Sequence, residues 1–153
     1  MEQKQETISE RLRLDMKGAL KGGDKERLSA IRMLIAELKN AQIAAQKELS
    51  LQEEEKVLAA YAKKRKESIE KYTDGGRKDL ADKEKREYDI TLSYLPRKLE
   101  EAELKAVISK HIEELGASGQ KDFGRVMKVV MSAVGSRAEG AAVSAMLREM
   151  LNG

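Results

Sequence analysis

The chain has 153 residues, of which 37% are charged, yet its formal net charge is only +3. This balance favours long solvated helices joined by ion pairs and disfavours an intrinsically disordered chain. Cysteine and tryptophan are absent and aromatic residues make up 3%, which excludes disulfides and a cysteine nucleophile and disfavours an aromatic platform for stacking bases.

The amino terminus lacks an apolar signal region, and no apolar run approaches the ~18 residues that a membrane span requires. We therefore expect a cytoplasmic protein without membrane association. The single proline and the abundance of alanine, leucine, glutamate, lysine and arginine favour helix throughout.

Four long helices are predicted before Pro96. Gly22 and Gly23 end the first helix, Asp24 caps the second, and Ser50, with Glu53 at capping-box spacing, precedes the third. Residues 74–76 separate the third helix from the fourth. Their apolar faces repeat at helical spacing and consist, in chain order, of Ile8, Leu12, Met16, Ala19 and Leu20; Leu28, Ile31, Leu34, Ile35, Leu38 and Ala41; Val57, Leu58, Tyr61, Ala62, Ile69 and Tyr72; and Leu80, Tyr88, Thr91, Leu92 and Leu95.

Three shorter helices are predicted after Pro96, and Ser136 with Glu139 has capping-box spacing before the last of them. Their apolar faces are Leu104, Val107, Ile108, Ile112 and Leu115; Phe123, Val126, Met127, Val130 and Met131; and Val143, Met146, Leu147 and Met150. A residue that precedes proline disfavours helix, so Pro96 marks a boundary. The predicted fold is all-α, with a long-helix N-terminal subdomain over residues 1–95 and a compact C-terminal three-helix subdomain over residues 96–153.

Few residues offer catalytic chemistry. His111 is the only histidine, and it borders an apolar stripe where a packed or half-exposed side chain is the ordinary outcome. Glu53, Glu54 and Glu55 are adjacent, so they splay around a helix instead of converging on a metal ion. These glutamates are predicted to lie in the first turn of a helix, where negative side chains interact favourably with the positive end of the helix dipole. We expect no catalytic residue, no metal ligand and no cofactor.

Basic residues in the last third carry the clearest functional signal. Lys121, Arg125 and Lys128 have spacings of four and three, so they are predicted to share one helical face. A cationic stripe near a glycine turn and a helix start suits a phosphate backbone, and an ordinary solvated face is the alternative. The candidate nucleic-acid-binding residues are Lys121, Arg125, Lys128, Arg137, Gly135 and Gly140.

Methionines lie on the helix faces of the same region. Core packing explains them most simply, and a flexible apolar docking surface is the alternative. They are Met127, Met131, Met146 and Met150.

Four segments taken together resemble the GatB/YqeY family, small bacterial proteins similar to the tail of the B subunit of the tRNA-dependent amidotransferase. The order and spacing of these segments extend the resemblance over nearly the whole chain. They are Arg27-Leu28-Ser29-Ala30-Ile31-Arg32-Met33-Leu34; Tyr94-Leu95-Pro96 with Leu99, Glu100 and Glu101; Leu115-Gly116-Ala117-Ser118; and the glycine-containing basic stretch over residues 121–140.

The resemblance implies a non-catalytic accessory module that binds tRNA or another structured RNA. In the amidotransferase the tail helps to hold tRNA while other domains perform the chemistry, so the link to translation and to a glutamine-dependent carbon–nitrogen ligase is one of family association. The low aromatic content favours recognition of shape and phosphates over stacking on single strands. The alternative is a protein–protein interaction module that docks through its C-terminal helices.

Overall fold

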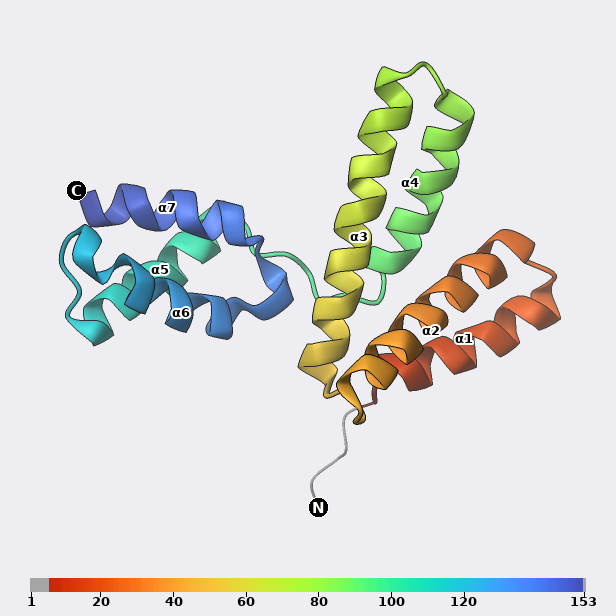
Figure 1. Cartoon of the computed structure of the whole chain (residues 1–153), viewed down its shortest axis with the longest axis horizontal. Coiled ribbons are helices and arrows are strands. Elements are labelled where there is room, and N and C mark those ends of the chain that lie inside the picture. The colour runs from red at the N-terminus through yellow and green to blue at the C-terminus, as the bar shows by residue number, and fades with distance from the viewer. Residues whose placement is uncertain (1–5, 153) are drawn as a thin grey trace. The chain divides into compact units, whose positions relative to one another are not determined.

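The computed structural model describes residues 6–152, and in this part of the chain it contains helices and no strand (Figure 1). The all-α prediction is confirmed. The α-helices are α1 (Ile8–Gly22), α2 (Lys25–Ala45), α3 (Leu51–Asp74), α4 (Lys78–Leu92), α5 (Glu101–Leu115), α6 (Phe123–Val134) and α7 (Gly140–Asn152), with short 3-10 helices η1 (Gln120–Asp122) and η2 (Gly135–Arg137). None of the helices described has the length and apolarity needed to cross a membrane.

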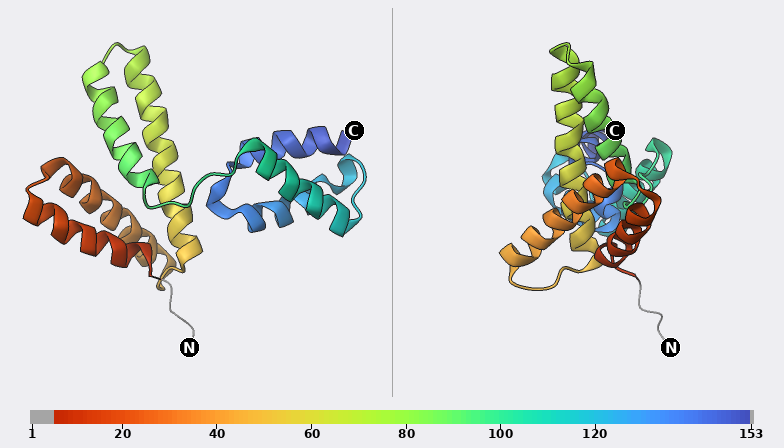
Figure 2. Two further views of the ribbon diagram at one scale, coloured as in Figure 1. Left: turned by 180° about the vertical axis from the view of Figure 1, so that it is seen from behind. Right: turned by 90° about the vertical axis from the view of Figure 1, so that its right-hand side faces the viewer.

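Contacts within the chain divide it into two compact units, Met1–Leu95 and Pro96–Gly153. The first unit is built of two helical hairpins, α1–α2 and α3–α4, and both members of each hairpin lie side by side in the different views (Figures 1 and 2). The second unit is the three-helix group α5, α6 and α7, in which α6 packs against both of the other helices.

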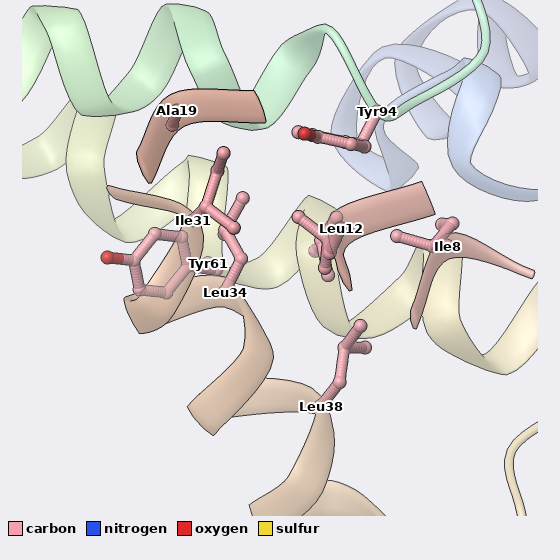
Figure 3. Close-up of a cluster of buried hydrophobic side chains, with 9 residues drawn as sticks. Ile8, Leu12, Ala19, Ile31, Leu34, Leu38, Tyr61 and Tyr94 are labelled. Carbon is pink, nitrogen blue, oxygen red and sulfur yellow. The ribbon is translucent and has the colours of Figure 1, made fainter. Parts of the chain in front are cut away.

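The core of the first unit forms where the apolar faces of the helices meet. In Figure 3, Leu12, Ile31 and Leu34 point into a common space, while the Tyr61 hydroxyl points away from it. Burial of each such side chain stabilises the folded state by roughly 1.5–3 kcal/mol. The buried cluster consists of Ile8, Leu12, Ala19, Ile31, Leu34, Leu38, Leu58, Tyr61 and Tyr94.

Helix boundaries in the first unit follow the predicted signals. Gly23 has a φ of 69°, a left-handed conformation that suits glycine, and it ends α1. The Asp24 side chain accepts from the backbone of Arg27 at the start of α2. Ser50 and Glu53 form the predicted capping box of α3. The helix starts that sequence reasoning identified here are therefore confirmed.

The core of the second unit is a separate cluster made of Leu104, Ile108, Val126, Val130, Val134, Val143, Leu147 and Leu151. The four methionines that the sequence singled out are partly buried against this cluster, so part of each side chain packs in the core. His111 is half-buried, with its Nδ1 3.5 Å from Glu114 Oε2.

Three details of the prediction are wrong. Leu20 is 53% exposed, because consecutive residues point about 100° apart around a helix and Ala19 takes the position toward the core. Ser136 lies in η2, and Ala138 is extended, so α7 begins only at Gly140. Lys121 lies in η1, so it precedes α6 instead of belonging to it.

Candidate nucleic-acid interface

Helix α6 separates an apolar side from a basic side. Val126, Val130 and Val134 are buried in the core of the second unit. The opposite side of the helix consists of four exposed residues, Gly124, Arg125, Lys128 and Ser132, which we call the α6 basic face. No aspartate or glutamate occurs between residues 123 and 138. Lys128 therefore meets no carboxylate on its own helix, and Arg125 pairs with Asp122, which directly precedes α6.

Arg125 is fixed in place by the end of α5 and by η1. Its Nη2 donates to the Leu115 carbonyl oxygen at 3.1 Å and to Asp122 Oδ1 at 3.2 Å. The Asp122 carboxylate also accepts from the backbone N–H of Ser118 at 2.9 Å. That backbone hydrogen bond, together with the positive charges of Arg125 and Lys121, lowers the pKa of Asp122. A guanidinium has five N–H donors, so the remaining donors of Arg125 are available to a bound anion.

The two lysines of the candidate set lie on η1 and α6. Lys121 is exposed on η1, and Lys128 is exposed near the middle of α6. The Lys128 side chain makes no hydrogen bond or ion pair with another residue of the described chain. The structure therefore places Lys121, Arg125 and Lys128 along one stretch of η1 and α6, although the stretch is not a single α-helix.

Arg137 and the two glycines lie beyond the other end of α6. Arg137 is half-buried; its Nε donates to the Arg97 carbonyl oxygen at 3.1 Å, and its own carbonyl oxygen accepts from the Leu99 N–H at 2.8 Å. Gly135 has φ 55° and ψ −127°, a conformation that residues with a side chain rarely adopt. Gly140 is exposed at the start of α7. Arg137 thus holds the entry segment of the second unit, a structural contact that its sequence position does not reveal.

Sequence reasoning missed the residues that position this region. Gln120 Nε2 donates to the Arg148 carbonyl oxygen at 3.1 Å and to Asn152 Oδ1 at 2.7 Å, which ties η1 to α7. The Arg148 guanidinium lies over the Phe123 ring, 5.2 Å from its centroid. Asp122 is three residues before Arg125, and this i,i+3 spacing of opposite charges was the one available signal.

Two basic residues before α5, Arg97 and Lys98, are paired with glutamates, whereas the side chain of Lys128 is not. Arg97 makes two hydrogen bonds of 3.0 Å to the Glu103 carboxylate, and this contact is the main cause that lowers the pKa of Glu103 to about 2. Lys98 Nζ lies 3.1 Å from Glu139 Oε1. Because these pairs neutralise their charges locally, they attract a polyanion less than Lys128 does.

The fold and the exposed residues of α6 define a small all-helical protein with a hairpin-built N-terminal unit and a three-helix C-terminal unit that exposes a basic helix face. The chain belongs to the Yqey-like protein family, whose family model matches residues 9–151. The family resemblance inferred from the sequence is thereby confirmed.

A curated relative is similar over most of the chain. The chain is 30% identical over 131 residues to Altered inheritance of mitochondria protein 41, mitochondrial, from Pyrenophora tritici-repentis. The aligned region covers 84% of this chain and 71% of that protein. Because the name of the relative places it in mitochondria, a cytoplasmic location for the present chain stays a prediction.

Proposed function

We propose that this protein is a non-catalytic module that binds tRNA or another structured RNA through the α6 basic face, as an accessory to glutamine-dependent amidation of tRNA. The observation that carries the proposal is the exposure of Arg125 and Lys128 on a helix face without carboxylates. The link to the amidotransferase rests on the family resemblance and on no residue of this chain.

The shape of the face supports contact with a phosphate backbone. Gly124 and Ser132 are small and exposed on either side of the two cations, so a sugar–phosphate strand is able to approach the helix closely there. Helix α6 is 12 residues long, and at 1.5 Å per residue it presents a face of about 18 Å. Phosphate contacts of this kind fix the position of a nucleic acid without reading its bases.

The candidate residues have different roles under this proposal. Lys121 and Lys128 supply point charges, and the fixed guanidinium of Arg125 offers a planar fork for two phosphate oxygens. Gly140 leaves the backbone at the start of α7 open, since an added Cβ would meet only the Met131 side chain at 3.9 Å. Arg137 contributes charge from a position that the Arg97 carbonyl holds.

A filter-binding titration against tRNA tests the proposal. The double variant Lys121→Ala/Lys128→Ala should bind about tenfold more weakly at low salt, a change of roughly 1.4 kcal/mol. Lys110→Ala removes an exposed lysine from α5 and serves as the matched control with unchanged affinity. Binding should also weaken steeply as salt rises, because phosphate contacts release counterions.

Two results would contradict the proposal. One is no retention of tRNA by the unaltered protein at low salt, and the other is equal affinity for the double variant and the control. Glutamine- and ATP-dependent amidation by the purified chain would contradict its non-catalytic part.

A further inference from the structure

We propose that the groove between α5 and α7 binds an amphipathic helix of a partner protein, with basic side chains flanking its apolar stripe. The groove has a volume of about 470 Å³ and lies in the second unit. Its apolar lining comes from α7, where Ala142 and Ala145 are exposed and Met146 and Met150 are half-buried. No residue of α6 lines it, so the groove is separate from the α6 basic face.

The arrangement of the three helices suits a helical occupant. Helix α6 packs against both α5 and α7, while the groove lies where α5 and α7 meet. A fourth helix in the groove would complete a four-helix bundle, a packing in which helices lie nearly parallel or antiparallel to their neighbours.

The side chains of the groove favour close approach of such a helix. Small residues at a helix contact allow axes to come within about 8 Å, and Ala142 and Ala145 provide them. The unbranched side chains of Met146 and Met150 adapt to the shape of an incoming apolar residue.

The charge of the rim selects a basic partner. Glu101 on α5 and Glu149 on α7 are exposed on the groove, and Lys105 is the single cation that lines it. Neither glutamate side chain forms a hydrogen bond or ion pair with another residue of the part that the structure describes. The net negative rim therefore complements lysine or arginine on both sides of an apolar stripe, and charge complementarity of this kind governs specificity more than affinity.

A defined peptide tests the proposal on the full chain. The probe is a dye-labelled synthetic helix of about 18 residues, or five turns, with leucine at helical spacing and lysine elsewhere. A second peptide has glutamate in place of every lysine. A third has the same composition as the first, with the leucines moved to positions that form no stripe along a helix. Fluorescence anisotropy should show that the lysine peptide binds at least about tenfold more tightly than either of the others.

Variants inside and outside the groove test whether the lysine peptide binds there. Ala145→Glu should weaken binding of the lysine peptide at least about tenfold, whereas Ala106→Glu, on an exposed part of α5 outside the groove, should leave it unchanged. The double variant Glu101→Lys/Glu149→Lys changes only exposed charges and should reverse the preference toward the glutamate peptide.

Several outcomes would overturn the proposal: equal binding of the three peptides, equal effects of Ala145→Glu and Ala106→Glu, or no reversal in the double variant. Sedimentation that shows dimers of this chain, lost in Ala145→Glu, would assign the groove to a second copy instead. Retention of tRNA by Ala145→Glu separates the two proposals, because the α6 basic face stays intact in that variant.

Discussion

Glu54 on α3 accepts two hydrogen bonds from Ser9 on α1, from its backbone nitrogen at 3.1 Å and from its hydroxyl at 2.7 Å. The other oxygen of the same carboxylate accepts from the Ile8 N–H at 3.1 Å. Glu54 is only 3% exposed. The buried carboxylate of Glu54 therefore accepts hydrogen bonds from the first backbone N–H groups of α1, at the positive end of that helix.

Replacing Glu54 by alanine should destabilise the first unit substantially. The change leaves two buried N–H groups without acceptors, and a hydrogen bond to a charged group is worth about 1.5–3 kcal/mol. We expect the free energy of unfolding, measured by urea denaturation, to fall by about 2–3 kcal/mol. Glu67→Ala, at an exposed position of the same helix, should change it by less than about 0.5 kcal/mol. Similar values for both variants would contradict the role of Glu54.

Alkaline pH should destabilise the protein through Tyr94. Burial and the hydrogen bond to Asp15 raise the pKa of this hydroxyl. The unfolded chain releases the tyrosine proton near pH 10, whereas the folded chain retains it, so the stabilising contribution is present below about pH 10 and is lost as the pH rises further.

Urea denaturation at several pH values measures this contribution. The free energy of unfolding should fall between about pH 9 and about pH 11. Tyr94→Phe should be about 1 kcal/mol less stable at neutral pH because it loses a hydrogen bond, and its alkaline fall should be shallower. Tyr88→Phe keeps Tyr94 and should retain the steep fall. An unchanged slope in Tyr94→Phe would count against this explanation.

Replacing each of two glycines in or next to α6 by alanine should change the stability of the protein in opposite directions. Gly135 has a φ of 55°, so Gly135→Ala forces a side chain into a strained backbone and should cost about 1–3 kcal/mol. Gly124 lies within α6 with open space where a Cβ would be, so Gly124→Ala should stabilise by about 0.5 kcal/mol. Thermal unfolding compares the two; a stabilised Gly135→Ala would refute the assigned conformation of this turn.

Alanine variants of Lys128 and Arg137 should affect different properties, the first the affinity for tRNA and the second the stability of the fold. Lys128→Ala removes an exposed side chain without a hydrogen bond or ion pair in the described chain, so it should leave thermal unfolding unchanged while reducing the slope of log affinity for tRNA against log salt by about one. Arg137→Ala removes the donor to the Arg97 carbonyl and should lower stability by about 1 kcal/mol. A stability loss in Lys128→Ala with an unchanged salt slope would make Lys128 a structural residue.

The helices themselves and the starts of α2 and α3 were predictable because their signals are local. Asp24 and Ser50 cap the helices that begin next to them, and apolar residues at helical spacing mark the buried faces. Glu54 was interpreted by its place in the first turn of its own helix, yet its partners lie 45 and 46 residues away. Spacing along one helix contains no information about such a partner.

The candidate interface was predictable in part for the same reason. The exposure of Arg125 and Lys128 follows from the apolar residues opposite them on α6. The hydrogen bond from Arg137 to the Arg97 carbonyl could not be predicted from the sequence. Every residue has a backbone carbonyl, so no residue type marks this partner. The groove between α5 and α7 depends on how two helices meet, so no motif marks it.

The contacts of Arg137 determine where an independently folding fragment of the second unit has to begin. Its Nε and its carbonyl oxygen bind Arg97 and Leu99, which both precede α5. A fragment cut at the first residue of α5 would lack both partners and lose two hydrogen bonds at the turn before α7. A fragment that begins at Pro96 would keep them, so the short segment before the helix belongs to the folded unit and is not a dispensable linker.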